Sequence, residues 1–223
     1  MSLKPQKKSD IDKAWAQRRY ERAVKIYPEY HLIVSEGTKT EPNYFNEIKT
    51  IINQKYKGRI QLEVHGTGDN TTFLFERTKS FVENSPNTFK HVWIVYDTDD
   101  FPRDKINEVP NLCEHENRTS ECCYHAIWSN QCIELWYLLH FSFMQSDIHR
   151  SLYFDKLSEQ LILIGAGAYK KNREDMFAIL RDYLDNAIKN AKILDRINTD
   201  KTPSESAPGT RVYELIEQLR PYI

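Results

Sequence analysis

Four acidic residues of this sequence stand where two apolar runs end, and their types and spacing suit the binding of a divalent cation. Glu36 follows the first run, and Asp97, Asp99 and Asp100 follow the second. Asp97 and Asp99 would point to the same side of an extended chain. Carboxylates held close together repel one another unless a cation or a proton lies between them. Because hard oxygen ligands suit Mg²⁺ or Mn²⁺ better than zinc, we expect such an ion at Glu36, Asp97 and Asp99, with Asp100 as a reserve ligand.

A further carboxylate, Glu134, lies in a segment that is apolar on nearly every side. Residues 132–141 read CIELWYLLHF, which predicts a largely buried helix. A buried carboxylate is costly unless it is paired or bound to a metal ion. The first turn of a helix also favours an anion. Glu134 is therefore a candidate ligand, or a residue that orients one; the alternative is a helix cap or an ion pair with an arginine.

The elements that must position these residues alternate between strands and helices. Strands are predicted at residues 30–34, 61–65, 91–96 and 123–128, with helices after each of them, the first capped by Thr40. This alternation favours an α/β fold with a mainly parallel sheet flanked by helices. In such sheets, sites gather beyond the carboxyl ends of the strands, which is where the acidic residues fall.

The chain divides into three predicted parts. Residues 1–28 form a basic N-terminal arm or short helix, residues 29–145 the α/β core, and residues 146–223 a helical extension packed on that core. The arm could follow a phosphate backbone, or it could be a solvated terminus. In the extension, residues 176–191 have the periodicity of one long amphipathic helix, and residues 210–219 that of a closing helix.

Composition narrows the possible classes of protein. The formal net charge is -1, so the overall charge gives no general attraction to nucleic acid, and any contact with phosphate must be local. No segment approaches the roughly 20 apolar residues that cross a bilayer, and the polar N-terminus does not resemble a secretion signal. Four cysteines without a framework spacing fit a reduced, cytoplasmic protein that does not enter membranes.

Three weaker sequence patterns could mark binding sites, but each also has an ordinary structural explanation. Lys39, Lys170 and Lys171 could contact phosphate, although surface lysines are usually only solvated. A glycine pair at residues 66 and 68 could cradle a phosphate, but a plain turn explains it as well. The cysteines and histidines of residues 113–125 match no common zinc spacing, so we expect buried free thiols there.

Three blocks of the sequence resemble the RloB-like family. They are VSEGTKTEPNYF at residues 34–45, YDTDDF at residues 96–101 and SNQCIELWYLLHF at residues 129–141. They stand in the family's order, and the likeness spans roughly residues 30–223. One departure is Gln131, where the family usually has proline; we expect it to change the start of the helix only modestly.

This resemblance implies a Toprim-like fold, the small parallel-sheet module of primases, topoisomerases and OLD-type nucleases. In that module a glutamate after the first strand and an Asp-x-Asp after a later strand serve Mg²⁺-dependent phosphoryl transfer; the matching residues here are Glu36, Asp97 and Asp99. The family is also associated with restriction loci and antiviral defence, often beside an ATPase gene, which implies an ATPase partner protein.

The function expected from residues and resemblance together is a metal-dependent nuclease. Glu36 would act as general base or bridging ligand, and Asp97 and Asp99 would anchor one or two Mg²⁺ ions. One alternative keeps the metal site for nucleotidyl transfer or small-nucleotide chemistry. Another is a non-catalytic subunit of an ATPase complex, with the aromatic content serving an interface. The sequence leaves open the choice between DNA, RNA and nucleotide substrates, the number of metal ions and the oligomeric state.

Overall fold

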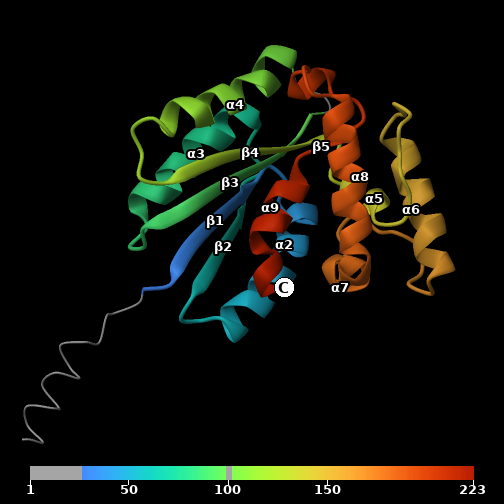
Figure 1. The fold of residues 1–223 in the computed structure, drawn as a ribbon, viewed down its shortest axis with the longest axis horizontal. Helices are drawn as coiled ribbons and strands as arrows, with labels where there is room; N and C mark the ends of the chain where they lie inside the picture. Colours follow the sequence, from blue (N-terminus) through green and yellow to red (C-terminus); the bar gives the residue numbers. More distant parts are fainter. Residues whose placement is uncertain (1–26, 99–101) are drawn as a thin grey trace, which may run out of the picture.

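A five-stranded sheet lies at the centre of the computed structural model, which describes residues 27–98 and 102–223 (Figure 1). The strand order is β2-β1-β3-β4-β5. The first four strands are parallel, and β5 is antiparallel to β4. The bounds are β1 Glu29–Ser35, β2 Ile60–Gly66, β3 Phe89–Asp97, β4 Cys123–Asn130 and β5 Gly209–Thr210. The predicted α/β fold with a mainly parallel sheet is therefore confirmed.

Helices cover both faces of this sheet. Helices α3 and α4 pack on one face, while α2, α5 and α9 lie on the other with α8, and α6 and α7 lie further out (Figure 1). The α-helices are α2 Thr40–Lys55, α3 Thr71–Asn84, α4 Arg103–Glu116, α5 Glu134–Leu139, α6 Ser151–Leu163, α7 Met176–Leu180, α8 Leu184–Ile197 and α9 Val212–Leu219. Three short 3₁₀ turns are η1 Arg181–Tyr183, η2 Pro203–Glu205 and η3 Arg220–Tyr222.

The alternation of side chains along β3 shows why this strand lies in the middle. Val92 and Ile94 belong to the apolar cluster beneath α3 and α4, whereas Trp93 and Val95 belong to the larger cluster beneath the other helices. All four side chains are buried. A strand covered on both faces reads as a continuous apolar run. Asp97 is the last residue of this strand and is partly exposed.

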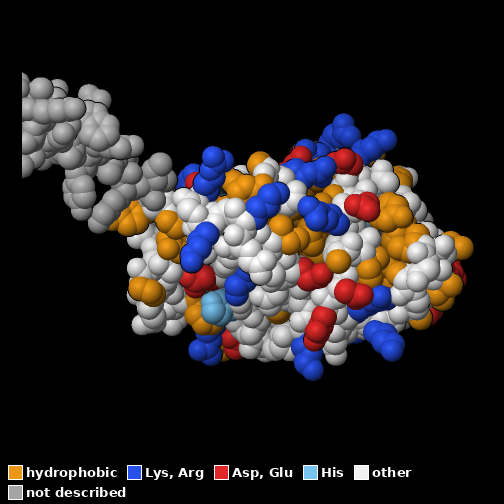
Figure 2. All heavy atoms as spheres, turned by 90° about the horizontal axis from the view of Figure 1, so that it is seen from below, with side chains coloured by type: hydrophobic (Ala, Val, Ile, Leu, Met, Phe, Trp, Pro, Cys, Tyr) orange, Lys and Arg blue, Asp and Glu red, His pale blue; other side chains and the backbone are white. Residues whose placement is uncertain are grey.

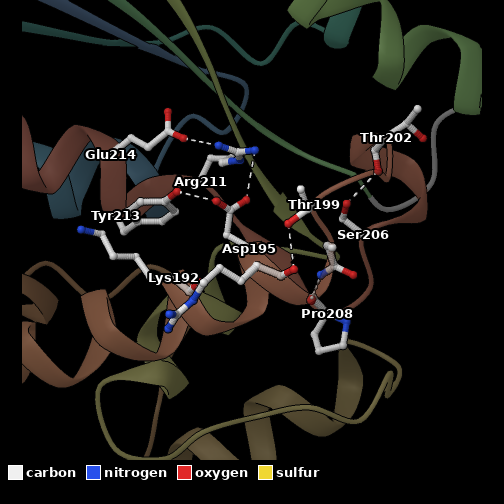
Figure 3. A network of polar contacts seen from close by, with 11 residues as sticks. Lys192, Asp195, Thr199, Thr202, Ser206, Pro208, Arg211, Tyr213 and Glu214 are labelled. Atoms are coloured by element: carbon white, nitrogen blue, oxygen red, sulfur yellow. Dashed lines mark hydrogen bonds and ion pairs between the residues drawn. The ribbon is translucent and has the colours of Figure 1, made fainter.

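The C-terminal segment returns to the sheet and is held there by polar contacts (Figure 3). Arg211 Nη2 lies 3.0 Å from Asp195 Oδ1, and the Tyr213 hydroxyl donates to Asp195 Oδ2 at 2.9 Å. The Asn198 amide donates to the Pro208 carbonyl at 3.0 Å. These bonds tie α8 to β5 and α9. The two-residue β5 was not predicted, because so short a strand within a polar loop carries no hydrophobic pattern.

Some local predictions were wrong. Thr40 does not cap α2, because its hydroxyl donates to the Lys171 carbonyl at 2.8 Å. The single helix predicted over residues 176–191 is divided into α7, η1 and α8, although its apolar positions still face the core. Residues 1–26, nearly all of the predicted basic arm or short helix, lie outside the described residues. The division at residues 145 and 146 stays a prediction, and both parts contribute to one apolar cluster.

None of the described helices has the length and apolar character that a membrane crossing requires.

Candidate acidic site

Glu36 and Asp97 lie side by side at the carboxyl edge of the sheet. They follow or end the adjacent strands β1 and β3, and the Glu36 amide donates to the Val95 carbonyl at 2.9 Å. The backbone N–H of Asp97 donates a hydrogen bond to the Glu36 carboxylate. Glu36 Oε2 is buried without a hydrogen-bond partner. The structure thus brings together two residues that are about 60 positions apart in the chain and leaves one carboxylate oxygen between them available to a ligand.

Glu134 joins them from the start of α5. Its side chain is 1 % exposed, and Oε1 accepts a hydrogen bond of 2.7 Å from the Tyr169 hydroxyl. The carboxylate is close enough to raise the pKa of Asp97 by charge repulsion. The predicted helix is therefore present in shortened form, and its carboxylate faces the acidic residues at the strand ends.

A fourth carboxylate, Glu41, was missed by the sequence reasoning. It lies in the first turn of α2 and is 5 % exposed. Its carboxylate packs so closely on Gly37 that a Cβ atom added there would overlap it. The signal was present: Glu41 stands five residues after Glu36, across a Ser-Glu-Gly turn that leads into a helix. Its role was hidden because an acidic residue in a first helical turn ordinarily needs no ligand to explain it.

These four side chains line one cleft of about 460 Å³. Lys39 and Lys171 line it too, while Lys170 lines a neighbouring hollow. The remaining lining residues are Gly37, Thr38, Thr40, Gly68, Asp69, Asn70, Ile133 and Asn172. The cleft therefore combines a crowded set of carboxylates with two lysine side chains.

The segment that carries Lys171 is fixed to the start of α2. Besides the bond from Thr40 to the Lys171 carbonyl, the Asn43 amide donates to the Asn172 carbonyl at 3.2 Å. Tyr169 N–H donates to Ser158 Oγ at 3.1 Å, which anchors the same segment on α6. A segment about 130 residues away in the chain thus forms one wall of the cleft.

Burial and mutual repulsion raise the pKa values of Glu36, Asp97 and Glu41. Burial raises the pKa of Glu36 to about 7, with a further increase from Glu41 and a partial offset by the Asp97 N–H. Burial also raises the pKa of Asp97 well above its usual range, and the carboxylates of Glu41, Glu134 and Glu36 add to this, while Lys171 lowers it. The pKa of Glu41 rises mainly through burial and also through Glu134. Without a counter-charge, this cleft resists full ionisation.

The donor set fits a hard cation, with one geometric condition. All four side chains offer oxygen, which suits Mg²⁺ or Mn²⁺. Among the described residues, no three of these carboxylates have oxygens that all lie within 4.8 Å of one another. An ion held here would therefore require side-chain rotation or bridging water. Mg²⁺ commonly keeps several waters and takes only one or two carboxylates directly, so this spacing is compatible with it.

Two further acidic residues follow Thr98 in the chain. Asp99 and Asp100 lie outside the described residues. Thr98 marks where the chain leaves the sheet: its N–H contacts the carbonyls of Ser129 and Gln131, and its hydroxyl is buried without a hydrogen-bond partner. The peptide bond before Gln131 is cis, and the Gln131 side chain accepts a hydrogen bond from the Arg150 N–H at 2.8 Å.

The expectation of buried free thiols holds for most of the cysteines. Cys113, Cys122 and Cys132 are buried free thiols, whereas Cys123 is exposed. Gly68 has φ +72°, and its N–H donates to the Glu36 carbonyl at 2.9 Å. The glycine pair therefore builds a turn that supports the Glu36 loop, since a glycine adopts this left-handed conformation without steric cost.

The fold and the cleft define an α/β protein with an acidic site at the carboxyl edge of a mainly parallel sheet. The chain belongs to the RloB-like protein family, whose sequence model matches residues 31–219. No curated protein and no solved structure gives a significant match. The resemblance seen in the sequence is thereby confirmed at the level of the family.

Proposed function

We propose that this protein hydrolyses phosphodiester bonds in nucleic acid with the help of Mg²⁺ or Mn²⁺, on a Toprim-like core. One observation carries the proposal: four carboxylates from the ends of β1 and β3 and the starts of α2 and α5 share a cleft with two lysines. Such crowding of like charge is costly in a folded protein. A bound dication offsets that cost, which gives a physical reason for the arrangement.

Each side chain has a role that follows from its surroundings. Glu36 has a pKa of about 7, so near neutral pH it can accept a proton from an attacking water, or bridge to the ion through its free Oε2. Asp97 and Glu41 would hold the cation, with Asp99 and Asp100 as proposed additional ligands. Glu134, fixed by Tyr169, would be a ligand or orient one. When bound, the cation would stabilise negative charge on the phosphoryl oxygens and lower the pKa of a bound water.

The lysines give the cleft its affinity for phosphate. Lys39 and Lys171 are exposed at its rim, and Lys170 points to the neighbouring hollow with Arg173. Because the chain as a whole has a net charge of -1, this local basic rim is what would draw a polyanion to the acidic centre.

A cleavage assay tests the proposal. Labelled DNA and RNA, single- and double-stranded, are incubated with the full-length chain and Mg²⁺, Mn²⁺ or chelator. We expect cleavage only with the metal, and a loss of about 100-fold or more in Asp97→Asn, since removing a metal ligand removes transition-state charge stabilisation. Asp182→Asn, an exposed aspartate on η1, is the matched control. Activity that survives Asp97→Asn refutes the assignment, and ligated or extended product would show nucleotidyl transfer instead.

A partnered role is the second candidate, favoured by the surface of α6. Leu152, Ile162, Leu163 and Ile164 are 47, 56, 77 and 40 % exposed on or next to this helix, and apolar side chains gather at that end of the molecule (Figure 2). Exposed apolar patches mark interaction sites in many proteins. In this reading an ATPase encoded nearby binds α6, and cleavage appears only when that ATPase is added to the chain.

A further inference from the structure

A cluster of side chains of types that can bind metals lies at the opposite, amino edge of the sheet. Glu29 and His31 on β1 and His91 on β3 each offer one ligand atom, and these atoms all lie within 4.8 Å of one another. No other group of three or more His, Cys, Asp or Glu side chains among the described residues meets that spacing. His31 and His91 are direct partners in the parallel pairing of β1 with β3. Their convergence therefore rests on rigid sheet geometry.

The distances within this amino-edge cluster approach those of a coordination shell. His31 Nε2 lies 2.8 Å from Glu29 Oε1, and His91 Nε2 lies 3.9 Å from the same oxygen. Metal–ligand bonds of about 2.0–2.1 Å in a tetrahedral arrangement place neighbouring ligand atoms about 3.3 Å apart. The two observed distances lie on either side of that value, and the ligand atoms of the two histidines are within 4.8 Å of each other.

The three side chains are ligand types that a dication binds in their deprotonated forms. Burial lowers the pKa of His31 to about 4, and it also lowers the pKa of His91. Burial works in the opposite direction on Glu29, but hydrogen bonds from Lys90 and His31 leave its pKa below the ordinary value. The directions of these pKa shifts agree with the geometry of the cluster.

Neighbouring groups orient the two imidazoles. His91 Nδ1 lies 3.0 Å from His125 Nε2, which leaves His91 Nε2 facing Glu29. Trp93 Nε1 donates to His31 Nδ1 at 3.4 Å, which leaves His31 Nε2 facing Glu29 as well. A metal-binding histidine commonly donates its other ring N–H to an outer partner, and His91 Nδ1 can make such a bond to His125.

We propose that Glu29, His31 and His91 form a binding site for Zn²⁺ or a similar transition-metal dication. Two imidazole nitrogens and one carboxylate oxygen favour such ions over Mg²⁺. Glu29 Oε1 is the ligand atom, while Oε2 keeps its contact of 2.7 Å with Lys90 Nζ. The side chains of Glu29 and His91 are 30 and 15 % exposed, so the ion reaches the cluster from solvent and retains a position for water.

Binding of the metal ion requires one proton of His31 to move. His31 Nε2 carries the hydrogen that it now donates to Glu29, because Nδ1 accepts from Trp93. For Nε2 to bind the ion, that proton moves to Nδ1, and the long Trp93 contact is lost. Trp93 also stacks on His125 with a ring separation of 4.0 Å. Its fluorescence should therefore report binding directly.

The amino-edge cluster is separate from the acidic cleft. Strand β1 has seven residues, from Glu29 to Ser35, and a rise of about 3.3 Å per residue places the two sites roughly 20 Å apart. The ion would cross-link the first described strand to the central strand of the sheet. Its expected effect is on stability, since the cluster shares no lining residue with the cleft.

Zinc titration of the full-length chain by calorimetry tests this site. Asp97→Asn is included in the starting protein so that the acidic cleft contributes less. We expect one zinc ion per chain, a change in tryptophan fluorescence and a higher melting temperature. In this background, Glu29→Gln or His91→Ala should weaken binding by about 100-fold or more, and His125→Ala by about 10-fold. His115→Ala, an exposed histidine on α4, is the control and should bind as the starting protein does.

Three results would overturn the proposal: no saturable binding, unchanged binding in Glu29→Gln, or equal loss in the His115→Ala control. Glu29→Gln keeps the size of the side chain and one acceptor oxygen, so it helps to separate loss of a ligand from loss of the fold. Circular dichroism of each variant identifies any that does not fold.

Discussion

The phenol of Tyr169 donates a hydrogen bond of 2.7 Å to Glu134 Oε1, across 35 positions of the chain. Glu134 is 1 % exposed, and Tyr169 stacks on Phe154 of α6 at a ring separation of 5.9 Å. Helix α6, through Tyr169, thereby helps to orient a carboxylate in the acidic cleft. We call Tyr169 a positioning residue, because it acts through Glu134.

Tyr169→Phe should leave the fold intact and disturb Glu134. Removing one partner of a buried carboxylate costs about 1–3 kcal/mol of stability. We expect metal-dependent cleavage to fall about 10-fold, with half-maximal activity at a higher Mg²⁺ concentration because the ligand set is less well held. Tyr183→Phe on η1 serves as the control. If the Mg²⁺ dependence of Tyr169→Phe matches the wild type, Tyr169 does not position the site.

Gly37→Ala should affect the site more than the fold. The added Cβ overlaps the carboxylate of Glu41, which is the flexible end of a side chain and can be displaced. Cleavage and metal affinity should therefore fall by about 10-fold or more, while stability changes by less than about 1 kcal/mol. Gly58→Ala, which meets no heavy atom within 4 Å, is the control.

Gly66→Ala gives the contrasting outcome. There the added Cβ would lie 2.5 Å from the Gly37 carbonyl and 3.0 Å from Thr38 Cα, so backbone must move. We expect a loss of about 1–3 kcal/mol in the free energy of unfolding, measured by urea denaturation. Equal stability of Gly37→Ala and Gly66→Ala would contradict the packing described around Gly37 and Glu41.

Asp97→Asn should stabilise the metal-free protein. Burial and three neighbouring carboxylates disfavour the ionised form of Asp97, so a neutral side chain of the same size relieves repulsion. We expect a gain of about 1 kcal/mol at pH 8 in chelator. Mg²⁺ should raise the melting temperature of the wild type, because it binds only the folded state, and should have little effect on the variant. A variant that is less stable in chelator would count against the proposed crowding.

The pH dependence of stability should change in Glu36→Gln. The pKa of Glu36 rises from 4.5 in its ordinary state to about 7 in the fold. Between these values the folded chain binds more protons than the unfolded chain, so the contribution of Glu36 is present at low pH and is lost as the pH rises. The loss across this window is on the order of 2 kcal/mol, and Glu36→Gln lacks it.

Buried histidines also make stability depend on pH, so the test measures the difference in stability between the wild type and Glu36→Gln. The pKa values of His31 and His125 are lowered to about 4, so their contribution to stability increases as the pH rises through about 4 to 6.5. Urea denaturation of wild type and Glu36→Gln, in chelator and at matched pH, cancels this shared effect. The wild type should lose stability relative to the variant from pH 5 to pH 7.5. A constant difference would show that Glu36 titrates normally.

The sequence by itself determined the parallel sheet and the edge at which Glu36 and Asp97 meet. Continuous apolar runs identify strands covered on both faces, and parallel strands with helical crossovers bring their carboxyl ends to one edge. The apolar surroundings of Glu134 likewise indicated a buried carboxylate near the same edge. These inferences succeeded because periodicity and element ends are local properties of the chain.

Only the tertiary structure decided which further residues share the cleft and which lie at the other edge. The positions of Glu41 and Tyr169 in the cleft depend on how α2, α5 and α6 pack. Strand β5 has only two residues, which are too few to show a hydrophobic pattern. The amino-edge cluster depends on the register that sets His31 opposite His91. A pattern of side chains reports which side of an element is buried, but packing angle and register between distant elements decide which atoms come within coordination distance.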